Sequence, residues 1–157
     1  MTPVAIFGSA FLLLAAAGGT HAMGGDSKPA TTAPAAPKAG GYTEAEKAVK
    51  AKEYEKAITM LEGVVGREPR NADALNYLAY SHRELGRNDV ALRYYQQALG
   101  INANHRGANE YLGQLYLKMG KISEAQAQLA KLEKLCGKGC EEFESLRAAI
   151  ERAAKRS

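Results

Sequence analysis

The sequence repeats itself with a spacing of 34 residues, and this period constrains the fold more than any other feature. When residues 72–105 are laid over residues 106–139, small or apolar residues recur at matching positions. The matched pairs are Ala74 and Ala108, Leu78 and Leu112, Leu85 and Met119, Gly86 and Gly120, and Ala91 and Ala125. An incomplete unit precedes them, because Ala57 stands one period before Ala91. Such a chain stacks similar helical or strand units side by side.

Each unit predicts two amphipathic helices joined by a short turn. Apolar residues recur at the i, i+3, i+4 and i+7 spacing of one helix face. The stripe of the first helix comprises Leu75, Leu78, Ala79 and His82, and that of the second comprises Ala91, Leu92, Tyr95, Ala98 and Leu99. Gly86 and Gly120 fall between the helices, where a residue without a Cβ takes a positive φ easily. We expect Ala57, Ala91 and Ala125 to lie in the core, where a small side chain lets paired helices approach closely.

This pattern resembles the tetratricopeptide repeat. The segment NADALNYLAYSHRELGRNDVALRYYQQALGINANH is similar to the consensus of that family at Leu78, Ala79, Gly86, Ala91, Tyr95 and Ala98. It departs from the consensus at Leu75 and Asn109, where an aromatic residue is usual, and only Pro69 keeps the closing proline. The resemblance implies an all-α, right-handed solenoid of about three helix-turn-helix units, at residues 42–71, 72–105 and 106–139.

The two ends of the repeat array differ from its middle. In the first unit the first helix is shortened to residues 43–51, and Thr43 with Glu46 predicts a capping box at its start. After the third unit, residues 141–156 carry Phe143, Leu146 and Ile150 on one face and charged residues on the other. We expect a helix here that caps the array. Its basic end is interpreted either as favourable charge at a helix C-terminus or as a contact for anionic lipid.

The N-terminal residues predict an export signal followed by a tether. Residues 1–22 contain no Asp, Glu, Lys or Arg, and the apolar run from Val4 to Ala17 is too short to span a bilayer. Small residues favour cleavage after Ala22, with a retained membrane anchor as the alternative. Residues 23–41 are rich in Gly, Ala, Pro, Ser and Thr, which is typical of a disordered linker. We therefore expect residues 42–157 to be a periplasmic domain that meets the membrane only through the signal segment.

Cys136 and Cys140 are the only cysteines, and they fall in the turn before residues 141–156. In an oxidising compartment such a pair favours a structural disulfide. The run LAKLEKLCGKGCEEFESL also resembles the end of small secreted tetratricopeptide proteins of proteobacteria, in which a similar pair precedes the final helix. Free thiols and a redox or metal role are the alternatives. A structural zinc ion needs four ligands, and with two in reach no metal site is predicted.

Composition and motifs argue against catalysis, cofactors and nucleic acid. The net charge of +4 is mild, and the basic residues are scattered among acidic ones, whereas a phosphate-binding face needs clustered cations. The sequence contains no phosphate loop, nucleophile elbow, HExxH motif or plausible catalytic triad. We expect His82 to pack between helices and His105 to be a turn residue at a helix start. Spacing also assigns packing between helices to Tyr94, Tyr95, Tyr111 and Tyr116.

The resemblance implies that a partner binds on the concave face, which in this family is lined by the first helix of each unit. Carried over by position, the candidate groove residues are Asp73, Asn76, Tyr80, Arg83 and Glu84 in the second unit and Glu110, Gln114, Leu117 and Lys118 in the third. This mixture suits recognition of a peptide, and a solvated face without a ligand is the alternative. The Lys and Asn residues by which some members clamp a C-terminal carboxylate are absent, because Tyr42 and Glu46 hold their first-unit positions.

The sequence thus predicts an exported interaction module that binds a protein or peptide and serves as a scaffold or assembly factor for a cell-envelope complex. Two alternatives stay open. One is a thiol-redox or metal-binding accessory protein that uses Cys136 and Cys140. The other is a solenoid that associates with itself through the edge left by its incomplete first unit.

Overall fold

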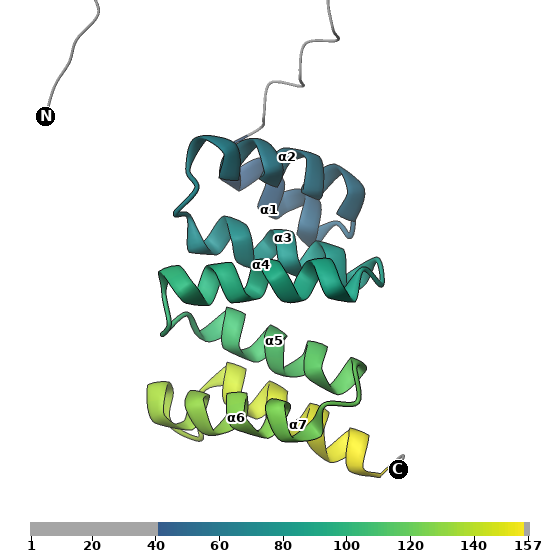
Figure 1. Cartoon of the computed structure of the whole chain (residues 1–157), viewed down its shortest axis with the longest axis vertical. Coiled ribbons are helices and arrows are strands. Elements are labelled where there is room, and N and C mark those ends of the chain that lie inside the picture. The colour runs from purple at the N-terminus through teal and green to yellow at the C-terminus, as the bar shows by residue number, and fades with distance from the viewer. Residues whose placement is uncertain (1–40, 156–157) are drawn as a thin grey trace, which may run out of the picture. The chain divides into compact units, whose positions relative to one another are not determined.

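The computed structural model describes residues 41–155, and within this range seven helices and no strands form one compact unit. The helices are α1 (Tyr42–Lys50), α2 (Tyr54–Arg67), α3 (Ala72–Glu84), α4 (Asn88–Ile101), α5 (Arg106–Lys118), α6 (Ile122–Cys136) and α7 (Glu141–Ala154). The helix pairs follow one another along the stack in chain order, and α7 lies with α6 at its end (Figure 1). The all-α solenoid predicted from the repeat is confirmed, with three helix pairs and a final helix.

The turn within each helix pair has the same backbone structure in all three repeats. The N–H group after the turn donates to the carbonyl oxygen five residues earlier, over 2.8 to 2.9 Å. These pairs are Glu53 and Ala48, Arg87 and His82, and Lys121 and Tyr116. The residue before each donor has a positive φ, which is 76° at Gly86, 72° at Gly120 and 61° at Lys52. Because a left-handed residue ends a helix while satisfying its last carbonyls, the first repeat makes the expected turn without the expected glycine.

Side chains cap the first helices of the second and third repeats at positions one period apart. The Asn71 Oδ1 atom accepts a hydrogen bond from the N–H of Ala74 at 2.9 Å. The His105 Nδ1 atom accepts the equivalent bond from Ala108 at 3.2 Å. These acceptors satisfy an N–H group that has no partner within the helix, and His105 lies at a helix start as predicted.

The capping box predicted for the first unit is wrong. Helix α1 begins at Tyr42, its N-cap position is Gly41, and no side chain caps it. The Glu46 carboxylate lies 3.0 Å from the Lys50 ammonium and accepts a hydrogen bond from the Tyr77 hydroxyl at 3.2 Å. The Glu46 carboxylate therefore interacts with Lys50, one turn further along α1, and with Tyr77 of α3. It does not reach back to the start of its own helix.

The core lies along the apolar stripes that the sequence predicts. The predicted α3 positions Leu75, Leu78 and Ala79 are at most 1% exposed, and Ala91, Tyr95 and Ala98 of α4 are fully buried. Ala57, Ala91 and Ala125 also have no exposed surface, which confirms their place in the core. Small residues at these points allow each pair of helices to pack closely, so a larger side chain there would overpack the core.

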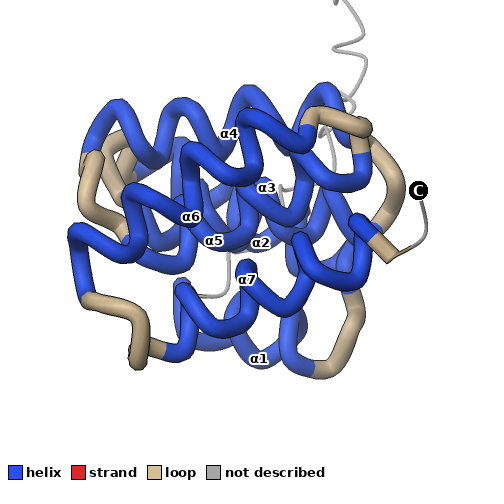
Figure 2. The backbone as a smooth tube through the Cα atoms, turned by 90° about the horizontal axis from the view of Figure 1, so that it is seen from below, coloured by secondary structure: helices blue, strands red, loops and turns tan. Residues whose placement is uncertain are grey.

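The first helices of the repeats form a continuous row, to which α7 is added at the end. Helix α1 packs against α3, α3 against α5, and α5 against α7. When the stack is viewed end-on, α4 and α6 lie along one side and α1 and α7 along the opposite side (Figure 2). The predicted capping role of α7 is confirmed, because Phe143 and Leu146 are 4% and 0% exposed and cover the last repeat.

Helix α7 approaches α5 at a glycine. A Cβ atom added to Gly113 would lie 2.5 Å from a methyl carbon of Leu146, far inside van der Waals contact. The equivalent position one repeat earlier is Ala79, which is fully buried. The terminal helix therefore occupies the place of a further first helix, and its close approach depends on the missing side chain of Gly113.

Several sequence predictions lie outside the described residues. They are the signal segment at residues 1–22 with its cleavage after Ala22, and the linker at residues 23–41 except for Gly41. None of the helices in residues 41–155 is long and apolar enough to cross a membrane.

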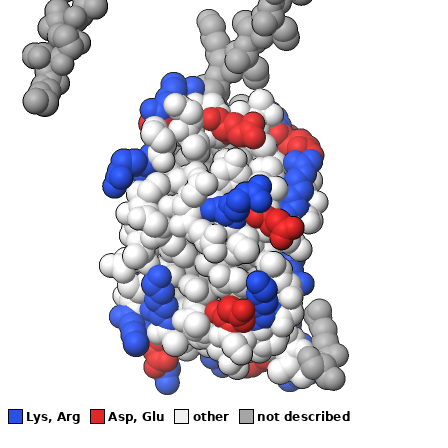
Figure 3. Space-filling view, viewed as in Figure 1, with Lys and Arg blue, Asp and Glu red and all other residues white. Residues whose placement is uncertain are grey.

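On the face drawn in Figure 3, Lys and Arg side chains are interspersed with Asp and Glu, as the mixed charge pattern of the sequence indicates.

Candidate functional site

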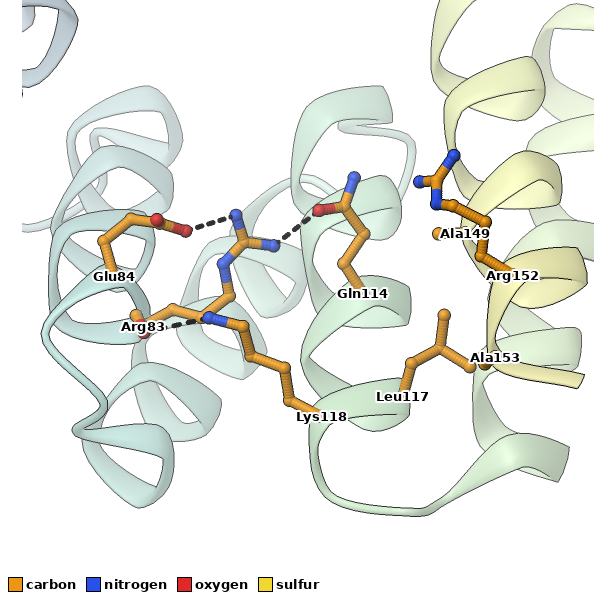
Figure 4. Close-up of a pocket in the computed structure, with 8 residues that line it drawn as sticks. All are labelled: Arg83, Glu84, Gln114, Leu117, Lys118, Ala149, Arg152 and Ala153. Atoms are coloured by element: carbon orange, nitrogen blue, oxygen red, sulfur yellow. Dashed lines mark hydrogen bonds and ion pairs between the residues drawn. The ribbon is translucent and has the colours of Figure 1, made fainter. Parts of the chain in front are cut away.

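Five of the predicted groove residues line one cavity of about 380 Å³. They are Arg83, Glu84, Gln114, Leu117 and Lys118, which come from α3 and α5. Helix α7 completes the lining with Ala149, Arg152 and Ala153 (Figure 4). We call this the cationic cavity. All the groove residues predicted from the sequence lie on α3 and α5, whereas in the structure α7 forms one wall as well.

Arg83 organises the wall of the cationic cavity. Its side chain is only 5% exposed, and its guanidinium donates to the side-chain oxygens of Gln114 and Glu84, each at 2.8 Å. The guanidinium carbon also lies 4.8 Å from the ring centre of Tyr80 and 5.3 Å from that of Tyr111. These are cation–π distances. Because both terminal nitrogens of its guanidinium donate within the protein, Arg83 fixes the geometry of the cavity and leaves little surface for a partner.

Tyrosine side chains line a second cavity of about 240 Å³ on the other side of Arg83. Its lining residues are Val49, Lys50, Lys52, Tyr54, Tyr77, Tyr80 and Tyr111. The Tyr80 ring lies 5.0 Å from Tyr111 and 6.1 Å from Tyr54, measured between ring centres. Burial raises the pKa of Tyr111 to about 12, so its hydroxyl is neutral and able to donate at physiological pH. We call this the tyrosine cavity.

Of the residues that line the tyrosine cavity, only Tyr80 is among the groove residues predicted from the sequence. Tyr111 was assigned to packing between helices, and the structure shows it half-buried and also lining the cavity. A signal was available, because Tyr77 and Tyr111 occupy the same position in successive repeats. Tyr54 gave no such signal, since it reaches the cavity from α2, the second helix of its pair.

Three predicted groove residues lie elsewhere. Asn76 and Glu110 are 5% and 8% exposed and therefore belong to the helix interfaces rather than to an open surface. Burial raises the pKa of the Glu110 carboxyl group, which accepts a hydrogen bond from the Gln114 amide at 2.9 Å. Asp73 lies in the first turn of α3 with its carboxylate 3.0 Å from His105 Nε2. It lines neither the cationic nor the tyrosine cavity.

The histidine and tyrosine residues assigned to packing are mostly confirmed. His82 is 7% exposed and stacks on Tyr94 with ring centres 5.6 Å apart. Burial is the main cause of its lowered pKa, and the nearby charge of Arg87 adds to it. Tyr95 is fully buried, and Tyr116 packs half-buried against the same core.

Cys136 and Cys140 form a disulfide between the end of α6 and the start of α7. A carboxylate oxygen of Glu142 lies within 4.8 Å of the sulfur atoms. This adds a third potential ligand to the two that the sequence offered, but paired sulfurs are not the thiolates that bind metals. Because the bond joins the end of α6 to the start of α7, it helps to hold α7 against the last repeat.

Helix pairs with a 34-residue period, stacked so that their first helices line a groove, define the tetratricopeptide class of repeat. This class is a non-enzymatic interaction module that binds proteins and peptides. Residues 50–132, more than half of the chain, match the model of a tetratricopeptide-like family described as anaphase-promoting complex, cyclosome, subunit 3, and the chain belongs to this family. No curated protein matches the sequence.

Solved structures similar to this chain share its fold. The first tetratricopeptide domain of Spaghetti (RPAP3) bound to the HSP90 peptide SRMEEVD is 20% identical, with a TM-score of 0.63 over 71% of this chain and 89% of that one. PcrH in complex with the chaperone binding region of PopD is 15% identical, with a TM-score of 0.65 over 73% and 89%. The Sgt2 domain from Aspergillus fumigatus is 21% identical, with a TM-score of 0.64 over 73% and 74%.

Proposed function

We propose that this protein holds an extended segment of a partner polypeptide in the groove formed by α1, α3, α5 and α7. The observation that carries the proposal is the pair of adjoining cavities on this row, one lined by tyrosines and one by charged side chains. Aromatic rings provide apolar contact area, and the charged groups provide directional hydrogen bonds. Two structurally similar domains, those of Spaghetti and PcrH, were solved with a peptide or a partner region bound.

We further propose that the module is exported to the periplasm and serves as a scaffold or assembly factor for a cell-envelope complex. The uncharged N-terminal segment with its small residues before Met23 supports export, and the Pro-rich stretch that follows suits a tether. The paired cysteines suit an oxidising compartment. The resemblance of the C-terminal segment to small secreted tetratricopeptide proteins of proteobacteria agrees with both.

Site-specific photo-crosslinking tests groove binding. A benzoyl-phenylalanine residue at Leu117, which lines the cationic cavity, is compared with one at Gln97, which is exposed on α4. Both proteins are expressed from the full-length gene in a Gram-negative host. We expect discrete adducts from the Leu117 position alone. Identical adducts from both positions, or none from either, would contradict binding in the groove.

Fractionation and mass spectrometry test export. We expect the protein in the periplasmic extract with Met23 as its first residue. A protein that keeps Met1 and stays in the cytoplasm would overturn the proposed location while leaving groove binding intact.

Thiol counting separates the interaction module from the thiol-redox alternative. Protein purified without reductant is treated with a thiol-reactive reagent under native conditions, before and after mild reduction. We expect no reactive thiol in either case. A pair that reduces readily would favour the redox alternative.

A further inference from the structure

The cationic cavity carries more positive than negative charge. Its charged lining residues are Arg83, Lys118, Arg152 and Glu84. Arg83 and Glu84 are paired with each other at 2.8 Å, and they therefore largely cancel. The charges left over are those of Lys118 on α5 and Arg152 on α7.

Neither Lys118 nor Arg152 has an acidic partner within residues 41–155. The Lys118 ammonium donates only to the main-chain oxygen of Arg83, over 3.4 Å. Arg147, which precedes Arg152 on the same helix, is by contrast paired with both Glu144 and Glu151. A bound anion would give these two cations of the cavity lining a partner of opposite charge. The Nε–H group of Arg83 is a further buried donor without a partner in this part of the chain.

The rest of the lining restricts the kind of anion that fits. Leu117 adds an apolar surface. Ala149 and Ala153 have short side chains, so the part of the lining that α7 contributes beside Arg152 projects little into the cavity (Figure 4). These short side chains leave room for a bound peptide to continue past α7. The ligand of the cavity is then expected to be a side chain within the peptide instead of its C-terminal carboxylate. The cavity of about 380 Å³ has room for a carboxylate together with its aliphatic stem.

The two cavities adjoin, because Arg83 lines one and its guanidinium packs on Tyr80 and Tyr111 of the other. A single extended peptide advances about 3.3 Å per residue, and so it reaches both cavities with side chains only a few positions apart. The tyrosine rings provide a surface for an aromatic or aliphatic side chain.

We propose that the cationic cavity is a subsite for an Asp or Glu side chain of the bound peptide, held by Lys118 and Arg152, with an apolar residue of the same peptide in the tyrosine cavity. This inference rests on the proposed groove function and adds its ligand chemistry. It makes the terminal helix part of the binding site as well as a cap.

Selection from a displayed library tests the subsite. The full-length gene product, purified from the periplasm, selects from random dodecapeptides that are fused at both ends and therefore offer no free carboxylate terminus. We expect enriched peptides to contain Asp or Glu within about three positions of an aromatic or aliphatic residue. The double variant Lys118→Glu, Arg152→Glu should lose these peptides.

The matched control is the double variant Arg93→Glu, Lys134→Glu, which makes the same charge change at exposed positions of α4 and α6. We expect this control to select the same peptides as the unaltered protein. If the groove variant also selects them, or if acidic residues are not enriched, the carboxylate subsite is wrong while peptide binding stands. A library without any binders would instead contradict the proposed groove function itself.

Synthetic peptides identify the source of the carboxylate. An enriched peptide is made with amidated ends, and its acidic residue is replaced by Gln or Asn. We expect affinity to fall about tenfold, since hydrogen bonds to charged groups contribute about 1.5 kcal/mol or more. A third peptide ends with a free carboxylate at the same position and has no acidic side chain. If this peptide binds best, the subsite reads chain ends and the proposal is overturned.

Discussion

At the scale of single residues, Lys52 is the clearest conflict between local sequence and backbone structure. It occupies the position that glycine holds in the other two repeats, and its φ of 61° lies in the left-handed region. A side chain in this region costs about 1 to 2 kcal/mol, because Cβ crowds the following carbonyl oxygen. The same turn forms in all three repeats, so the backbone hydrogen bonds of the repeat outweigh this cost.

We expect Lys52→Gly to raise the free energy of unfolding by about 0.5 to 1 kcal/mol. The gain is smaller than the full strain, since glycine also increases the entropy of the unfolded chain. Urea denaturation measures it. As controls, Gly86→Ala and Gly120→Ala should be destabilised at the equivalent positions, where φ is 76° and 72°. A Lys52→Gly protein less stable than the parent would show that φ strain does not limit this turn.

His82 makes stability depend on pH. Burial, together with Arg87, lowers its folded-state pKa below the ordinary histidine value of 6.5. Well above pH 6.5 both folded and unfolded His82 are neutral, and stability is at its full value. As pH falls below 6.5 the unfolded chain binds a proton before the folded protein does, so stability decreases until the folded-state pKa is passed.

We expect His82→Phe, which keeps a ring for stacking on Tyr94, to remove part of the loss of stability between pH 7 and pH 5.5. Equal slopes for the parent and His82→Phe would show that other groups cause the acid sensitivity.

At the scale of helices, Gly113 determines how closely α7 packs. A Cβ atom there would lie 2.5 Å from Leu146, and Leu146 is fully buried, so the added methyl group has to displace α7. We expect Gly113→Ala to lower the free energy of unfolding by about 1 to 3 kcal/mol. Alanine otherwise favours a helix over glycine by about 1 kcal/mol, and the steric clash has to exceed this gain.

Gly107→Ala is the matched control on the same helix, because its Cβ would meet no atom closer than 3.5 Å. It should be neutral or stabilising. The double variant Gly113→Ala, Leu146→Ala should lose less unfolding free energy than the two single variants lose in sum. Removing the Leu146 methyl groups makes room for the methyl group added at Gly113. If the two losses of unfolding free energy were strictly additive, the effect of Gly113→Ala would not come from its contact with Leu146.

The sequence was sufficient to predict the helix pairs, the buried stripes, the cap and the cysteine pairing, because each depends on spacing along a single helix or turn. It was insufficient to predict contacts between side chains of neighbouring repeats. The rings of Tyr80 and Tyr111 meet across two helices, and Glu46 turns to Tyr77 of α3 instead of its own helix start. The α7 wall of the groove was likewise missed, because the family pattern assigns the concave face to the repeat helices alone.

At the scale of the whole domain, the two ends of the stack should differ in local stability. A solenoid is held together mainly by contacts between neighbouring elements, so its ends open first. Helix α1 is nine residues long, has no side-chain cap at its start and is followed in the turn by the strained Lys52. Helix α7 is longer, buries Phe143 and Leu146, and is joined to α6 by the disulfide.

We therefore expect hydrogen exchange to be fastest in α1, slower in α7 and slowest in α3 and α5, which have neighbours on both sides. Mass spectrometry of peptides that cover residues 42–50 and 141–154 provides the comparison. Replacing both cysteines by serine should accelerate exchange in α7 and leave α1 unchanged, whereas Lys52→Gly should slow exchange in α1 alone. If α7 of the oxidised protein exchanged as fast as α1, the disulfide and the Leu146 contact would not hold the terminal helix, and Arg152 would lack the fixed position that a carboxylate subsite requires.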